Sequence, residues 1–236
     1  MKFPSPLVEG RLERRYKRFF ADVRLADGTQ VTAHCANPGS MKSCLIEQGR
    51  VWLSDSRNPK RKLRLTWELA EAEGARIFVN PQAANRVVSE ALVRGGVAEL
   101  KGFENLRSEV RFGAHTRFDF ALEHGPTQCF VEVKNVTLGL GNGRAAFPDS
   151  VTERGARHLQ ELIRVVQSGQ RAVLLFCVSR SDARSAEPAS DIDPNYAHWL
   201  RRAHDAGVEV LAYKCRVTQR GVWLDRPLPV HLNATG

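Results

Sequence analysis

Three side chains in the middle of the sequence have the types and the spacing for chemistry on a phosphate group. The stretch CFVEVKNVTL is mostly apolar, as a buried strand would be, yet it carries Glu132 and Lys134 two residues apart. Because side chains alternate between the two faces of a strand, both residues are expected on one face. In the preceding stretch, RFDFAL, Asp119 is expected on the face opposite to Phe118 and Phe120. A hairpin of these strands predicts Asp119 beside Glu132 at the rim of a sheet.

A pair of neighbouring carboxylates with an amine suits metal-assisted hydrolysis. Two carboxylates repel each other unless a cation neutralises them, and oxygen ligands of this type favour Mg²⁺ or Mn²⁺. With Asp119 and Glu132 as metal ligands, the ion would activate a water molecule, and Lys134 would position the nucleophile or stabilise the anion. This predicts hydrolysis of a phosphodiester. The alternative is that Glu132 and Lys134 only form ion pairs on a half-exposed sheet face, each contributing about 0.5 kcal/mol.

The segment that precedes these strands is rich in short strand signals. RYKRFFADVRL and QVTAHC read as the two strands of a hairpin closed at Asp27-Gly28. Further strands are expected at 50–56, 62–73 and 75–80. Four or five short strands in this part of the sequence suffice for a small closed β-barrel such as an OB-fold, with a sandwich fragment as the alternative.

At Asn80-Pro81 the pattern changes to helices mixed with strands, and we place the domain boundary there. Domains of residues 1–80 and 81–236 are therefore expected. The second begins with a helix over QAANRVVSEALVRGG and continues with strands near 105–112, 117–122 and 129–137. The predicted class is α/β with a β-barrel domain, in which an OB-fold precedes an α-β-β-β-α-β unit.

The remainder of the chain is expected to complete the sheet and to cover it. Ser150 and Glu153 form a capping box, which predicts a helix ending near Ser168. The unbroken apolar run AVLLFCVS predicts a strand covered on both faces, followed by a helix from Asp193 and by the strand VEVLAYKC. The glycine-rich stretch LGLGNGRAAFP and residues 179–193 are expected to be loops.

The composition favours a polyanionic partner. The sequence has 35 Lys and Arg against 26 Asp and Glu, a net charge of +9 with His neutral. Residues 1–84 hold 15 basic and 9 acidic side chains, so an excess of +6 is concentrated in the first domain. Such a balance suits nucleic acid or a membrane surface, and charge alone does not choose between them.

Secretion and insertion into a membrane are not expected. No apolar run reaches the roughly 18 residues that span a bilayer, and the first residues lack the apolar core of a signal peptide. The five Cys form no C-x-x-C pair, which argues against a disulfide framework and against a zinc finger. A cytoplasmic protein with reduced cysteines is predicted.

Basic side chains cluster in two stretches where they could contact phosphates. The candidates for nucleic-acid contact are Arg11, Arg14, Arg15, Lys17, Arg18, Arg154 and His158. Arg154 and His158 are four residues apart on a predicted helix, so both can lean toward one phosphate. Tyr16, Phe19 and Phe20 could stack on unpaired bases, although strand alternation favours a core position for at least one of the two Phe residues.

The order of Asp119 and Glu132-Val133-Lys134, on the second and third strands after a helix, resembles the PD-(D/E)XK nuclease superfamily. In that superfamily a glutamate of the first helix often completes the acidic set, and Glu90 matches this position. One departure is that Phe118, rather than proline, precedes Asp119. The resemblance implies that Asp119, Glu132, Lys134 and Glu90 are catalytic.

Longer matches make the whole chain similar to the sugar fermentation stimulation protein A (SfsA) family. They include PLVEGRLERRYKRFFADV, HCANPGSM, NRVVSEAL, VEVKNVTL and FPDSVTERGARHLQEL, and they run from about residue 5 to 225. The resemblance implies an OB-fold joined to a nuclease-like, restriction-endonuclease-like domain. It also implies DNA binding without marked sequence preference and a regulatory role in maltose or sugar metabolism.

Three functions follow from these observations. A DNA-binding protein that uses the nuclease-like domain only for binding comes first. The alternative is an Mg²⁺- or Mn²⁺-dependent nuclease that acts on DNA or RNA. A transcriptional regulator that responds to a small ligand comes third, because the helices are separated by strands and form no helix-turn-helix pattern.

Overall fold

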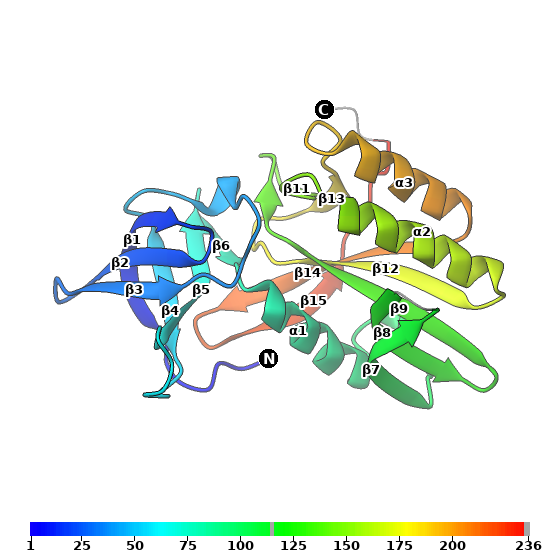
Figure 1. Ribbon diagram of the computed structural model, residues 1–236, viewed down its shortest axis with the longest axis horizontal. Coiled ribbons are helices and arrows are strands. Elements are labelled where there is room, and N and C mark those ends of the chain that lie inside the picture. Colours follow the sequence, from blue (N-terminus) through cyan, green and yellow to red (C-terminus); the bar gives the residue numbers. More distant parts are fainter. Residues whose placement is uncertain (114–115, 234–236) are drawn as a thin grey trace.

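Five strands of the N-terminal half close into a barrel in the computed structural model, which describes residues 1–113 and 116–233 (Figure 1). They are β1 (Val8–Tyr16), β2 (Phe20–Leu25), β3 (Gln30–His34), β4 (Arg50–Asp55) and β5 (Leu65–Ala72), and β6 (Ala75–Phe78) extends the sheet. The strand order is β3-β2-β1-β4-β5-β6, and a pairing of β3 with β5 closes the barrel. The predicted OB-fold is confirmed.

The first hairpin of the barrel differs from the prediction. RYKRFFADVRL was expected to be one strand, but Tyr16 pairs with Phe20 across a tight turn, so the stretch is divided between β1 and β2. The second hairpin joins β2 to β3 at Asp27-Gly28, as expected, and Gly28 has the positive φ of 85° that this turn requires.

A mixed sheet forms the centre of the second domain, as predicted, in the order β15-β14-β12-β9-β8-β7. Its strands are β7 (Asn105–Phe112), β8 (Thr116–His124), β9 (Thr127–Val136), β12 (Arg171–Val178), β14 (Glu209–Thr218) and β15 (Gly221–Pro227). β12 runs parallel to both β9 and β14, and the pairs at the two edges are antiparallel. Nearly every residue of β12 is buried, as its unbroken apolar sequence predicts.

Helices cover both faces of this sheet (Figure 1). α1 (Pro81–Val93) packs Val87 and Val88 into an apolar cluster on one face. α2 (Glu153–Gln167) and α3 (Pro194–Asp205) pack Leu159 and Leu200 into a second cluster on the opposite face. The end of β9 therefore lies between α1 on one face of the sheet and α2 on the other.

Two expected loops contain short strands. The glycine-rich stretch carries β10 (Leu138–Gly139) and β11 (Arg144–Phe147), and residues 179–193 carry β13 (Ser185–Pro188). These strands form a small sheet of order β10-β11-β13, and all residues of β13 are buried. The prediction of a surface loop at 179–193 was wrong because β13 is held by a parallel pairing with a distant segment. The chain also has one-turn 3₁₀ helices at Lys42–Cys44 and Ala98–Leu100.

The cap of α2 also differs from the prediction. Thr152 rather than Ser150 is the N-cap, and its side chain accepts a hydrogen bond from the backbone N–H of Gly155. The backbone N–H of Thr152 donates in turn to Asp193, the N-cap of α3, at 2.8 Å. The start of α2 is thus set by the neighbouring helix, and the proposed Ser150–Glu153 box is not formed.

The barrel and the α/β domain share buried contacts. The backbone N–H of Phe78 donates to the carbonyl of Ser179, and Ile77 forms a bridge with Arg180. Trp52 and Phe78 of the barrel lie in the same apolar cluster as α1. Within the described parts of the chain, no helix has the length and apolar character needed to cross a bilayer.

Candidate functional site

A cleft of about 800 Å³ opens between the barrel and the α/β domain. On the barrel side it is lined by Phe19 and residues 36–39. On the other side it is lined by the beginning of α1, by the end of β9, and by residues 146–152 with the first turns of α2. Asp119, Glu132 and Lys134 all lie in this lining, so the structure brings the three predicted residues together.

Asp119 is held where the pairing of β8 with β9 stops. The regular register ends at Phe120 and Val131. One carboxylate oxygen of Asp119 accepts the backbone N–H of Val133 at 2.7 Å, in place of a strand partner. The other oxygen accepts a hydrogen bond from Asn85 Nδ2, on α1, at 2.7 Å. Asp119 is therefore fixed from both β9 and α1, next to Glu132.

The alternation of β8 breaks at this residue. The sequence predicted Phe118 and Phe120 on one face, but Phe118 packs against Phe130 in the cluster below α2, and Phe120 belongs to the cluster below α1. Opposite the break, on β7, Glu109 has a φ of 54°, which is uncommon for a residue other than glycine. The irregular backbone leaves Asp119 at the sheet rim rather than on either face.

Glu132 has one satisfied and one unsatisfied oxygen. Its Oε1 accepts a hydrogen bond from Lys134 Nζ at 2.6 Å, and His158 Nδ1 is bonded to the same oxygen. Its Oε2 is buried and has no hydrogen-bond partner among residues 1–113 and 116–233. The side chain of Glu132 is only 5% exposed, and those of Lys134 and His158 are each 13% exposed. The glutamate thus presents one bare anionic oxygen in a recess of the cleft.

A chain of hydrogen bonds connects Glu132 to the surface of α2. Arg154 Nε donates to His158 Nε2 at 3.3 Å, and the other ring nitrogen of His158 faces Glu132. This pattern assigns the proton of a neutral imidazole to Nδ1, which donates to the carboxylate. His158, predicted as a phosphate contact, is therefore directed at a carboxylate, while Arg154 is exposed and lines the cleft.

The pKa values of the two carboxyl groups are shifted in opposite directions. Burial, reinforced by the negative charge of Glu132, raises the pKa of Asp119 to about 6. Burial also disfavours the charged form of Glu132, yet Lys134 and the hydrogen bond from His158 outweigh it and hold the pKa of Glu132 below its ordinary value. Glu132 therefore keeps its charge to lower pH than Asp119, whose pKa is about 6.

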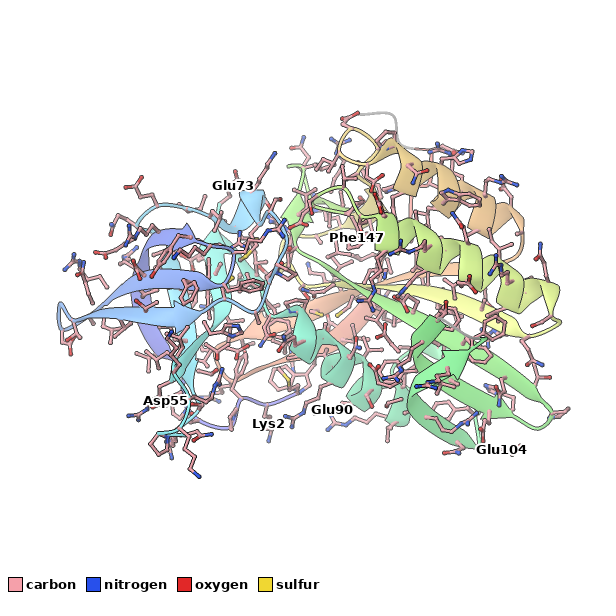
Figure 2. All side chains as sticks on the ribbon, viewed as in Figure 1. Lys2, Asp55, Glu73, Glu90, Glu104 and Phe147 are labelled. Atoms are coloured by element: carbon pink, nitrogen blue, oxygen red, sulfur yellow. The ribbon has the colours of Figure 1, made fainter. Side chains whose placement is uncertain are left out.

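Glu90 does not line this cleft. Its carboxylate pairs with the α-amino group of Met1 at 2.8 Å and with Arg86 at 3.3 Å. It lines a smaller hollow on the other side of Asp119. In Figure 2, Glu90 lies near Lys2 and away from Phe147, which lines the cleft.

The residue of α1 that contacts the acidic pair is Asn85, which the sequence did not single out. Five positions separate Asn85 from Glu90, which places them about 140° apart around a helix axis. Val87 and Val88 of the same helix lie in the core. Asn85 lines both the cleft and the smaller hollow beside Asp119, whereas Glu90 lines only the hollow.

Most of the cations predicted in the barrel have protein partners. Arg14 pairs with Asp22 at 2.8 Å, and Arg11 donates to the carbonyl of Gln48. The guanidinium of Arg15 donates to backbone carbonyls, which are those of Arg18, Asn37, Gly39 and Ser40. Lys17 and Arg18 are exposed at the turn between β1 and β2. Within residues 11–18, the cations best placed to contact a ligand are therefore Lys17 and Arg18 at the turn.

The acidic pair fits a divalent cation that keeps other ligands. The described residues contain no group of three or more His, Cys, Asp or Glu placed to hold a metal ion. Mg²⁺ is commonly held by one or two carboxylates, with water and substrate phosphate completing its coordination. Two recessed carboxylates, one with a bare buried oxygen, match that requirement.

Comparisons with known proteins agree over both domains. A family model described as the SfsA N-terminal OB domain matches residues 14–79, and one described as the sugar fermentation stimulation protein RE domain matches residues 82–221. Curated relatives named sugar fermentation stimulation protein homolog include one from Maricaulis maris, 55% identical over 99% of this chain and 100% of its own length. Another, from Geobacter sulfurreducens, is 54% identical over 98% of each chain.

A solved structure has the same fold. The SfsA protein of Pyrococcus furiosus, determined in complex with Ca²⁺, is 26% identical, with a TM-score of 0.88 over 98% of this chain and 99% of its own. The two family models and the curated relatives together cover nearly the whole sequence. This chain therefore belongs to the sugar fermentation stimulation protein A (SfsA) family.

Proposed function

We propose that the protein is a nucleic-acid phosphodiesterase that depends on Mg²⁺ or Mn²⁺ held by Asp119 and Glu132. The observation that carries the proposal is the buried Oε2 of Glu132, which lacks a partner in the described chain and lies beside a second carboxylate. A buried anionic oxygen without a partner is costly, and a bound cation would remove that cost. A divalent ion bound there would supply Lewis-acid activation of water and of the phosphate.

The side chains around the pair have separate tasks in this proposal. Lys134 donates one of its three protons to Glu132, which leaves donors for a phosphate oxygen in the cleft. His158 holds the orientation of Glu132, and Arg154 places a guanidinium at the cleft surface for a neighbouring phosphate. Asp119 is held by Asn85 and by the backbone of β9, so it is positioned before any ligand arrives.

Four further points support the proposal. Asp119 and Glu132-Val133-Lys134 lie on neighbouring strands behind a helix, as in the PD-(D/E)XK superfamily. The relative from Pyrococcus furiosus was determined with Ca²⁺, which shares a preference for oxygen ligands with Mg²⁺. The net charge of +9 favours a nucleic acid, DNA or RNA, as the polyanion. All five cysteines are free and buried, in keeping with a cytoplasmic site of action.

Binding of DNA without cleavage is the second candidate. The positive charge favours it, because phosphate contacts require no acidic centre. Under this candidate, a regulatory effect on maltose or sugar metabolism would follow from sequence-nonspecific DNA binding.

The test is cleavage of DNA and RNA oligonucleotides with Mg²⁺, Mn²⁺ or a chelator. Wild-type protein is compared with Glu132→Gln, Lys134→Met and the control Glu47→Gln, an exposed residue outside the cleft. Cleavage is expected to need metal, to be lost in Glu132→Gln, and to fall roughly 10²-fold or more in Lys134→Met. Equal cleavage by all four proteins, which would point to a contaminant, or no cleavage by any, would contradict the proposal. The second result, together with salt-sensitive binding, would favour DNA binding alone.

A further inference from the structure

We infer that the cleft takes a single nucleic-acid strand and that an unpaired base stacks on Phe19. The inference rests on the proposed function and narrows its substrate class. It is carried by two independent features, the depth of the acidic pair and the structure of the hairpin that presents Phe19 to the same cleft.

The acidic pair is too recessed for an intact duplex. Glu132 is 5% exposed and Asp119 is half-buried, and both lie in a cleft whose two walls come from different domains. The cleft volume of about 800 Å³ falls within the roughly 300–1,000 Å³ that is usual for small-molecule pockets. That space admits a few nucleotides of one strand. A phosphate of a duplex would reach Glu132 only after local unpairing, which costs stacking and pairing energy.

Phe19 is an exposed aromatic ring on the opposite wall of this cleft. It is 47% exposed, whereas Tyr16 and Phe20 on either side stack on each other with ring centroids 5.4 Å apart. Those two rings therefore belong to the barrel, and Phe19 is the one that remains available. The sequence predicted a core position for at least one of Phe19 and Phe20; Phe20 is half-buried against Tyr16, and Phe19 is exposed.

The turn that carries Phe19 is strained and tightly fixed. Lys17 and Arg18 have φ values of 45° and 63°, in the left-handed region that residues other than glycine rarely occupy. The backbone N–H of Phe19 donates to Lys17 at 2.7 Å, and its carbonyl accepts from Cys35 at 2.8 Å. Arg15 also donates to the carbonyl of Arg18. The backbone that carries Phe19 is thus fixed before a ligand binds, so that stacking on the ring does not require the turn to become ordered.

The same turn supplies charge for the backbone of the strand. Lys17 and Arg18 are exposed next to Phe19, and neither side chain has a hydrogen bond or ion pair within residues 1–113 and 116–233. Proteins that bind single strands combine such cations with aromatic side chains on which bases stack. Double-stranded nucleic acid offers the cations its phosphates but keeps its bases stacked on each other, so only a single strand uses all three residues.

The test measures binding in chelator, where cleavage does not interfere. Fluorescence anisotropy compares labelled single-stranded DNA, single-stranded RNA and a duplex of the same sequence. Phe19→Ala is expected to weaken single-strand binding at least about fivefold and duplex binding by less than twofold. Phe19→Trp should retain the affinity, and its fluorescence should be quenched by the bound base. The control is Ile46→Ala, another exposed apolar residue of the barrel that does not line the cleft.

The outcomes separate this inference from the proposed function. Unchanged single-strand binding in Phe19→Ala, or an equal loss for single strand and duplex, would overturn the inference. Tighter wild-type binding to the duplex would overturn it as well. None of these results bears on whether the acidic pair hydrolyses a phosphodiester. Conversely, a protein that cuts nothing with metal but shows the Phe19 effect in chelator would retain the single-strand site and lose the proposed chemistry.

Discussion

Asp119 and Glu132 lie on adjacent strands, yet their protonation differs because their surroundings differ. Glu132 has Lys134 and His158 on one oxygen, which hold its pKa low in spite of burial. Asp119 accepts hydrogen bonds only from neutral donors. Burial, reinforced by the charge of Glu132, raises its pKa to about 6, and the charge of Lys134 offsets this only in part. A divalent cation between the two would favour both charged forms at once.

The raised pKa of Asp119 predicts a pH-dependent affinity for Mn²⁺. A proton and the metal compete for the same carboxylate, so affinity should rise as pH increases to about 6 and level off above it. Calorimetric titration with Mn²⁺ from about pH 5 to about pH 8 measures this. A flat affinity over that range would show that Asp119 is not a ligand, and Asp119→Asn should give that flat, weaker profile.

The same shift affects stability in the absence of metal. The folded-state pKa of Asp119 lies above its ordinary value of 3.8, so the folded protein binds the proton more tightly than the unfolded chain does. The stability contributed by this group is present below about pH 4 and is lost as pH rises through about 6. We therefore expect the stabilisation by Mn²⁺, measured by thermal denaturation, to be larger at about pH 7 than at about pH 5.

His158 is expected to act on rate through Glu132. Mutation of a residue that orients a metal ligand typically lowers activity or metal affinity 10- to 100-fold. We therefore expect His158→Ala to lower the rate of cleavage by about that factor. Arg157→Ala is the matched control, because Arg157 is exposed on the same helix and does not line the cleft. If His158→Ala weakened nucleic-acid binding and left the rate at saturation unchanged, His158 would be a phosphate contact instead.

Among the helices and strands, the sequence pattern predicted correctly the features that depend only on neighbouring residues. Alternation placed Glu132 and Lys134 on one side of β9, and the apolar run of β12 marked a central strand. The sequence pattern gave wrong predictions where contacts with distant segments determine the structure. Polar-looking β13 is buried by pairing with β11, Thr152 caps α2 with the help of Asp193, and Phe118 changes face at an irregular point of β8.

For the same reason Asn85 was missed and His158 was assigned to a phosphate rather than to Glu132. Asn85 and His158 reach Asp119 and Glu132 because α1 and α2 cover opposite faces of the sheet, and no short stretch of sequence encodes that packing. The aspartate and glutamate could be found because both lie on one hairpin.

The contact between the barrel and the loop before α2 should be sensitive to one added methyl group. Met41 N–H donates to the carboxylate of Asp149 at 2.9 Å, and a Cβ on Gly39 would clash with that carboxylate. Gly39→Ala is therefore expected to destabilise the protein by about 1–3 kcal/mol, measured by urea denaturation. Ser40→Ala, which removes a hydrogen bond to Asp149 without adding bulk, is the comparison. Wild-type stability in Gly39→Ala would mean that the two segments do not meet as described.

At the scale of the whole molecule, the positive charge is only partly available to a ligand. Arg14, Arg24 and Arg50 are paired with acidic side chains of the barrel, and Arg15 is committed to backbone carbonyls. The exposed charge near the cleft comes from the turn of β1 with β2 and from Arg154. Affinity for nucleic acid should therefore depend on few phosphate contacts in spite of the net charge of +9.

The salt dependence of binding measures how many phosphate contacts the protein makes. Each phosphate contact steepens the slope of log affinity against log salt concentration by about 0.7 for a single strand and about 0.9 for duplex DNA. Replacing Lys17 and Arg18 together by Ala should reduce the slope by about 1.4 to 1.8, measured by anisotropy in chelator. Arg94 and Lys101, exposed and outside the cleft lining, form the control pair. Equal reductions in both double variants would mean that the ligand contacts the whole surface rather than this turn.

The most direct test of the central claim is anomalous diffraction from crystals soaked in Mn²⁺. We predict a manganese peak within bonding distance of Asp119 and of the Oε2 atom of Glu132, which has no partner in the described chain. The peak should vanish in crystals of Glu132→Gln. Full manganese occupancy elsewhere with none at this pair, or a peak that persists in Glu132→Gln, would contradict the claim.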